Sequence, residues 1–143
     1  MHILLVEDSV VEASLLIEAL RDSPLPARMS VIGSGDQVLA YLRRQGEYRR
    51  VARPNLILWS LPIFALKVHN VLYEIETDPA LRMIPVFLLT SDRSRIVYRQ
   101  QEGFPDVRVV PKPMGLDDYV ALLNEVAAWW QGTTPREFQS PRL

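Results

Sequence analysis

The chain has 143 residues, of which 48% are hydrophobic and 23% charged, a composition that supports one folded core and argues against disorder. Its net charge of -1 excludes a general attraction to nucleic acid or to an anionic membrane, and the lack of cysteine excludes disulfides and thiolate metal sites. No apolar stretch approaches the roughly 20 residues that span a bilayer, and Glu7 and Asp8 follow the first apolar run too early for a signal peptide. We therefore expect a cytoplasmic protein with one domain over residues 1–130 and a tail over residues 131–143.

Five short runs rich in Leu, Ile and Val are bounded by polar or turn residues and predict strands. Four of them are apolar nearly throughout, as expected for strands that are covered on both faces. The predicted strands are residues 3–6, 28–32, 55–60, 85–89 and 107–110.

Segments with helical spacing lie between these runs. The first begins at Ser9, with Glu12 three residues later in a capping-box pattern. The second covers residues 36–44, and residues 92–101, which are mostly polar, predict a helix that is held loosely to the core. The expected inward faces are Ala13, Leu16, Ile17 and Leu20 in the first helix, Val38, Leu39 and Leu42 in the second, Val68, Val71, Leu72 and Ile75 in the third, and Leu116, Val120, Leu123, Ala127 and Trp130 in the last.

Strands that alternate with helices predict an α/β fold, with a three-layer, doubly wound, five-stranded parallel sheet. In such sheets, ligands bind at the carboxyl ends of the central strands. The polar residues Glu7, Asp8, Ser60, Thr90 and Lys112 come at or just after the ends of four of the predicted strands. We therefore expect them to share one cleft.

These residues, in this order and spacing, resemble the receiver domains of two-component response regulators over residues 2 to about 130. The separations of 30 residues from Ser60 to Thr90 and 22 from Thr90 to Lys112 match those between the family's phosphoacceptor, its hydroxyl residue and its lysine. Glu7 and Asp8 match the family's acidic pair, and Lys112 followed by proline matches its Lys-Pro pair, which usually has a cis peptide bond. The resemblance implies the flavodoxin-like receiver fold.

The details are most similar to single-domain regulators that partner bacterial phytochromes. The similar features are residues 42–48, the long loop before the third strand, residues 78–85, and the final aromatic pair with its tail. The resemblance implies a sensor histidine kinase as the partner, such as a bacteriophytochrome, or a second response regulator.

The resemblance also implies roles for individual residues. In the family, the acidic pair and the acceptor aspartate hold Mg²⁺, aided by a backbone carbonyl two residues after the acceptor, which is here that of Pro62. The acceptor attacks a phosphohistidine. The lysine and the hydroxyl residue, here Lys112 and Thr90, then bind the phosphoryl group and pull the fourth-helix region into an active state.

The sequence departs from the family at several of these positions. The acceptor position holds Ser60, which is neutral, a poor ligand for Mg²⁺ and a weak nucleophile without a base. Val109 stands where the family has its switch aromatic, and residues 62–68 replace the usual acceptor loop. Because position 60 lacks the family's negative charge, we expect Lys112 to pair directly with Asp8. We also expect that the protein has no resident cofactor and that its affinity for Mg²⁺ is weakened.

Ser60 has two further interpretations. It could be phosphorylated by a serine kinase, which would give a stable modification, or it could be a hydrolase nucleophile. The second reading lacks the glycines of a nucleophile elbow, and only His2 and His69 could act as its base. We therefore expect that the protein is not an enzyme.

Two surface features suggest contacts with other proteins. A basic run is interpreted first as a solvated surface and second as a partner contact, and no DNA-binding motif accompanies it. Its members are Arg43, Arg44, Arg49, Arg50 and Arg53, the last three of them in the long loop over residues 45–54. Trp129 and Trp130 are adjacent, so that one indole faces the core while the other is exposed, which favours a homodimer in which the tail packs on the partner.

The sequence thus predicts an atypical single-domain response regulator, a pseudo-receiver that acts by protein–protein interaction and is not phosphorylated at the usual position. Two alternatives stay open. The protein could retain phosphoryl binding through another carboxylate, Asp8, or it could be an adaptor with no connection to histidine kinases.

Overall fold

The computed structural model describes residues 1–60, 66–90 and 107–133, with the backbone alone for residues 66–69 and 133. The helix predicted over residues 92–101, the carbonyl of Pro62 and most of the tail lie outside the described residues. The chain divides into two compact units. The first consists of Met1–Ala13 and Ala27–Lys112, and the second of Ser14–Pro26 and the residues from Pro113 onward.

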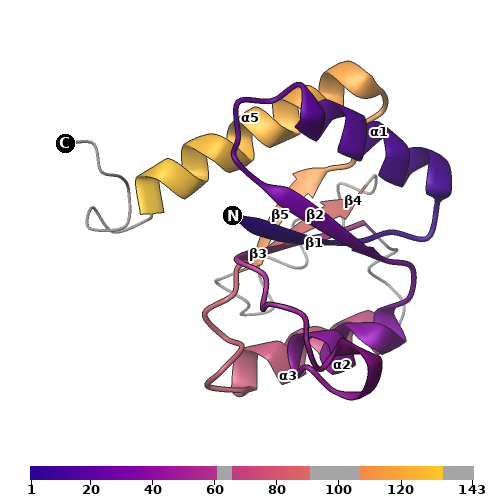
Figure 1. Ribbon diagram of the computed structural model, residues 1–143, viewed down its shortest axis with the longest axis vertical. Coiled ribbons are helices and arrows are strands. Elements are labelled where there is room, and N and C mark those ends of the chain that lie inside the picture. Colours follow the sequence, from indigo (N-terminus) through magenta and orange to yellow (C-terminus); the bar gives the residue numbers. More distant parts are fainter. Residues whose placement is uncertain (61–65, 91–106, 134–143) are drawn as a thin grey trace. The chain divides into compact units, whose positions relative to one another are not determined.

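A parallel five-stranded sheet in the order β2-β1-β3-β4-β5 forms the centre of the first unit (Figure 1). All five predicted strands are confirmed, with ends that differ by no more than one residue. Their bounds are His2–Val6 for β1, Arg28–Ile32 for β2, Leu56–Trp59 for β3, Val86–Thr90 for β4 and Val107–Pro111 for β5.

The helices follow the predicted order. Their bounds are Val10–Arg21 for α1, Val38–Leu42 for α2, Leu66–Thr77 for α3 and Leu116–Thr133 for α5, with short 3₁₀ turns η1 at Gly35–Gln37 and η2 at Gly46–Tyr48. None of the helices in the described part of the chain is long and apolar enough to cross a membrane.

The second predicted helix is shorter than residues 36–44, because α2 ends in a Schellman motif. The Gln45 N–H donates to the Ala40 carbonyl at 2.9 Å, and the Arg44 N–H donates to the Tyr41 carbonyl at 3.1 Å. Arg44 occupies the left-handed position of this motif, with φ of 55°, where glycine is the usual residue.

The core of the first unit lies between the sheet and the two helices α2 and α3, which Figure 1 shows on the same side of the sheet. Alternate residues of each central strand point to this side, including Val6 in β1 and Trp59 in β3. The residues between them, such as Leu5 and Leu58, are also buried, so both faces of the central strands are covered. The helix residues of this core are Val38, Tyr41, Leu42, Val71, Leu72 and Ile75.

The inward face predicted for α5 is wrong in part, since Leu116 and Val120 are exposed. Both stripes have helical spacing and are apolar, so periodicity alone does not choose between them. The prediction for α1 has one error of the same kind, because Ile17 is exposed and Ala19 is buried in its place. The residues of α5 that are buried are Tyr119, Leu122, Leu123 and Val126.

Candidate functional site at the carboxyl edge of the sheet

The sheet order places a topological switch point between β1 and β3, because the chain continues from β1 to one side and from β3 to the other. Val6 and Trp59 are paired in the register of these strands, and the Ser60 N–H donates to the Val6 carbonyl at 2.9 Å. Glu7 and Ser60 therefore follow neighbouring strands at the same edge of the sheet.

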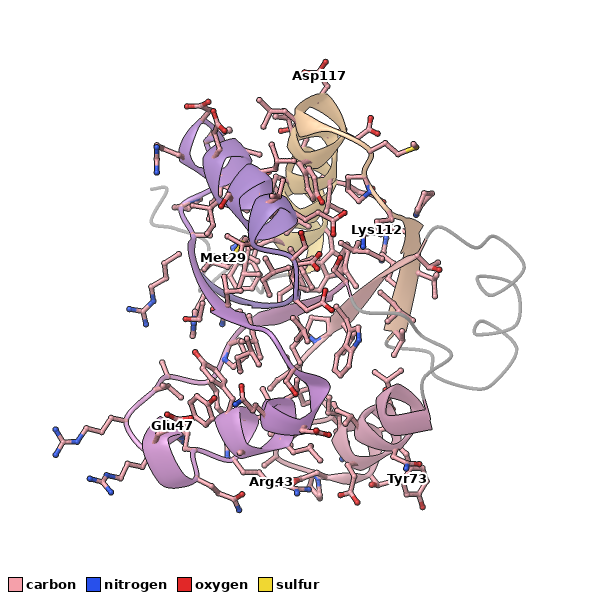
Figure 2. All side chains as sticks on the ribbon, turned by 90° about the vertical axis from the view of Figure 1, so that its right-hand side faces the viewer. Met29, Arg43, Glu47, Tyr73, Lys112 and Asp117 are labelled. Atoms are coloured by element: carbon pink, nitrogen blue, oxygen red, sulfur yellow. The ribbon has the colours of Figure 1, made fainter. Side chains whose placement is uncertain are left out.

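The ends of β4 and β5 complete this edge. Thr90 is the last residue of β4 and is buried, and its carbonyl accepts a hydrogen bond from the Lys112 N–H at 2.8 Å. Figure 2 shows Lys112 near the end of β5, far from Arg43 and Tyr73. The structure thus brings Glu7, Ser60, Thr90 and Lys112 to one edge, as the sequence predicts.

Ser60 is buried, with only 4% of its surface exposed. Its Oγ has no hydrogen-bond partner among the described residues. Its carbonyl oxygen lies 3.4 Å from Lys112 Nζ, which donates to it. The backbone of Ser60 is therefore used at this edge, whereas its buried hydroxyl forms no hydrogen bond with the described part of the chain.

Glu7 is likewise only 4% exposed. Its Oε2 accepts a hydrogen bond from the Ser9 N–H at 3.0 Å, and Ser9 Oγ accepts one from the Glu12 N–H at 3.2 Å. The predicted capping box is therefore half formed, since Ser9 caps α1 but the carboxylate that meets the Ser9 N–H comes from Glu7 and not from Glu12.

Lys112 forms its ion pair with Glu12, at 3.2 Å between Nζ and Oε2, and the predicted pair with Asp8 is wrong. Asp8 is exposed and has no ion pair among the described residues. The side chains of Lys112 and Glu12 are 27% and 33% exposed, so water screens this pair only in part. Glu12 is the residue that sequence reasoning missed, because its capping-box spacing already gave it a local role.

The described residues offer few ligands for a magnesium ion. Mg²⁺ prefers an octahedral set of oxygen ligands that includes carboxylates. No group of three or more His, Cys, Asp or Glu side chains in the described ranges is placed to hold a metal ion. Ser60 is neutral and the Glu7 carboxylate already accepts a hydrogen bond from the backbone, so Asp8 is the one carboxylate of these three residues that forms no hydrogen bond or ion pair with the described residues.

The position that matches the switch aromatic holds a packed residue. Val109 is half-buried in β5 and packs against the core of the first unit. Next to it, Arg108 lies over the ring of Phe87 at 5.5 Å from its centroid, which gives this charged residue of β5 a cation–π contact. The Lys112–Pro113 peptide bond is trans, unlike the cis bond that is usual in the family.

His2 cannot serve Ser60 as a base, because it is the first residue of β1 and lies at the opposite edge of the parallel sheet. Its Nε2 is 2.9 Å from Ser30 Oγ and 3.3 Å from the hydroxyl of Tyr41. Burial lowers the pKa of His2, and the positive charge of Arg28 lowers it further. His2 is a neutral residue of the framework, and the side chain of His69 lies outside the described residues.

The basic run has two kinds of member. Arg43 pairs with Glu74 at 3.0 Å and with Asp78 at 3.6 Å, and Arg53 Nε donates to the Leu42 carbonyl at 3.1 Å. These two arginines make contacts within the first unit, although Arg53 is exposed. The remaining members, Arg44, Arg49 and Arg50, are exposed as well.

A parallel sheet of order 2-1-3-4-5 with an acidic pair, a threonine and a lysine at its switch-point edge defines a receiver domain, and the chain belongs to the receiver family of response regulators. It is 39% identical to the response regulator Rcp1 of Synechocystis sp. over 131 residues, which cover 92% of this chain and 89% of that protein. No protein-family model matches the chain.

Solved structures agree with this assignment. The phosphorylated cyanobacterial phytochrome response regulator RcpA superposes with a TM-score of 0.77 at 31% identity, over 94% of this chain and 96% of that chain. The Mn²⁺-bound form of Rcp1 superposes with a TM-score of 0.73 at 30% identity, over the same shares. The predicted fold class, the flavodoxin-like receiver fold, is confirmed, and the chain is close to regulators of the phytochrome type.

Proposed function

We propose that this protein is an atypical single-domain response regulator that acts by protein–protein contact and takes no phosphoryl group at position 60. The observation that carries the proposal is the state of Ser60. This residue stands at the switch point, its hydroxyl is buried, and its Oγ has no partner among the described residues.

The chemistry of serine supports this reading. A serine hydroxyl attacks phosphorus only when a positioned base removes its proton, and no described side chain accepts a hydrogen bond from Ser60 Oγ. The nearby acidic pair offers no such base, because Glu7 accepts from the Ser9 N–H and Asp8 is exposed. The remaining family chemistry needs a divalent ion, for which the described residues offer few ligands.

The relatives suggest the partner. RcpA is a phytochrome response regulator, and the chain retains the scaffold of that protein over nearly its whole length. We infer a sensor histidine kinase of the phytochrome type, or a competent response regulator, as the protein that this chain binds. Such a pseudo-receiver would titrate its partner and would catalyse no reaction of its own.

We further propose a homodimer, supported by the paired tryptophans near the end of α5. Trp129 and Trp130 are both half-buried, and their ring centroids are 6.3 Å apart at an interplanar angle of 44°. Large aromatic side chains that remain partly exposed are enriched at interfaces. The exposed arginines of the long loop have no accompanying nucleic-acid motif, so the proposed contacts are with proteins.

The test combines phosphotransfer with binding. A phytochrome histidine kinase carrying radiolabelled phosphate is mixed with this protein and, as a positive control, with RcpA, whose structure is that of a phosphorylated protein. We expect RcpA to acquire an acid-labile label and this chain to acquire none, while interferometry detects binding of the chain to the kinase. Acid-labile label on this chain that disappears in Asp8→Ala would overturn the proposal in favour of the second carboxylate. Absence of both label and binding to kinase or regulator would instead favour the adaptor.

A further inference from the structure

Lys112 is connected to three other segments of the first unit. Its Nζ lies 3.2 Å from Glu12 Oε2 in the first turn of α1 and 3.4 Å from the carbonyl oxygen of Ser60 after β3. Its backbone N–H donates to the carbonyl of Thr90 at 2.8 Å. One residue therefore ties the end of β5 to the ends of β3 and β4 and to the start of α1.

Glu12 is available to Lys112 because Glu7 has taken over its expected role. In a complete capping box the glutamate would return to the Ser9 N–H, but Glu7 Oε2 already accepts from that group at 3.0 Å. The backbone N–H of Glu12 still donates to Ser9 Oγ, which places the residue in the first helical turn while its carboxylate remains free to meet an ammonium group.

The charge balance at this edge explains why the pair forms. With a neutral side chain at Ser60, the nearby acids are Glu7, Asp8 and Glu12. Glu7 is buried against the backbone and Asp8 is exposed without an ion pair among the described residues. Glu12 is thus the carboxylate that pairs with Lys112. Its negative charge takes the place of the charge that an aspartate at position 60 would supply.

We propose that Glu12 is a resident counter-ion that positions Lys112, standing in for the missing carboxylate at position 60 and competing with any other anion for the ammonium group. This role rests on contacts within the first unit and does not depend on the identity of the partner. It gives the ammonium group of Lys112 a counter-ion without a metal ion or a phosphoryl group.

The chain offers a simple assay, because Lys67 and Lys112 are its two lysines. The folded protein is acetylated briefly with sulfo-NHS-acetate, and the modification of Lys112 relative to Lys67 is measured by mass spectrometry. We expect Glu12→Gln to raise this ratio about two- to fivefold, the effect of losing a partly exposed charge pair. Asp8→Asn should leave the ratio unchanged, because Asp8 does not hold the ammonium group.

A second control distinguishes a role of Glu12 as the counter-ion of Lys112 from a role in the stability of α1. Ser9→Ala removes the cap of α1 but keeps the Glu12 carboxylate, so general fraying of the helix would raise Lys112 acetylation in this variant too. A rise in Ser9→Ala as large as that in Glu12→Gln, or a rise in Asp8→Asn, or no rise in Glu12→Gln, would overturn the proposal.

The stand-in role has its own test in the same assay. Ser60→Asp supplies the missing carboxylate, and it should compete with Glu12 for Lys112. We expect Glu12→Gln to raise acetylation less in the Ser60→Asp background than in the natural sequence. An equal rise in both backgrounds would show that Glu12 does not substitute for a carboxylate at position 60.

Discussion

Replacing Ser60 by alanine removes a hydroxyl that is buried without a hydrogen-bond partner among the described residues. Leaving such a group unsatisfied costs about 1–3 kcal/mol of stability. The void left by one oxygen atom, roughly 10 Å³, costs about 0.2 kcal/mol at ~24 cal/mol per Å³. The balance predicts that Ser60→Ala unfolds with a free energy about 1 kcal/mol higher than that of the natural sequence.

Urea denaturation followed by tryptophan fluorescence, to which the buried Trp59 contributes together with Trp129 and Trp130, measures this change, with a higher midpoint and an unchanged m-value as the expected result. The matched control is Ser9→Ala at the same edge. Ser9 Oγ accepts a hydrogen bond from the Glu12 N–H, so its removal should cost about 1 kcal/mol. A loss of about 1 kcal/mol or more in Ser60→Ala would refute the reasoning, because it would mean that the hydroxyl has a partner and a use.

Further predictions concern the rest of the chain. Arg44→Gly should raise the unfolding free energy by about 0.5–1 kcal/mol, because Arg44 has φ of 55°; a destabilised variant in urea would contradict this. Because the pKa of His2 is lowered in the folded state, the unfolded chain binds a proton at His2 more readily than the folded chain does at pH values below the ordinary pKa of 6.5. The His2 contribution to stability is therefore present above that pH and is lost as the pH falls through the lowered pKa. Denaturation at a series of pH values should show that the unfolding free energy of His2→Gln falls less steeply with decreasing pH than that of the natural sequence. Equal slopes for the two proteins would show that His2 does not contribute to the acid loss of stability. Trp129→Ser with Trp130→Ser should convert the proposed homodimer to a monomer in light scattering, which a monomeric natural protein would disprove.

The positions of the strands could be read from local patterns. A strand that is buried on both faces must be apolar at successive positions, so a run such as residues 3–6 predicts a strand. The predicted ends of the five strands agree with the structure to within one residue. The switch-point edge follows from the same information, since parallel strands end on one side. Glu7, Ser60, Thr90 and Lys112 were therefore correctly predicted to share an edge.

The choice of partner at that edge could not be read in this way. Asp8 and Glu12 are both acids close to the end of β1, and the sequence favours Asp8 for Lys112 because Asp8 matches the family's acidic pair and position 60 lacks a negative charge. In the folded chain Glu7 meets the Ser9 N–H, and Lys112 pairs with Glu12. The carboxylate that pairs with Lys112 is the one whose oxygen lies nearest to Nζ in the folded chain. That distance depends on how the first turn of α1 is placed beside the end of β5.

The sequence by itself determined the five strands, their alternation with helices in a parallel sheet, and the neutral residue at position 60. Periodicity and strand polarity are local properties, so they survive without coordinates. The tertiary structure decided that Lys112 pairs with Glu12 and that the buried hydroxyl of Ser60 meets no hydrogen-bond partner in residues 1–60, 66–90 and 107–133. Both depend on side chains from distant segments reaching the same few ångströms, which no spacing along the chain specifies.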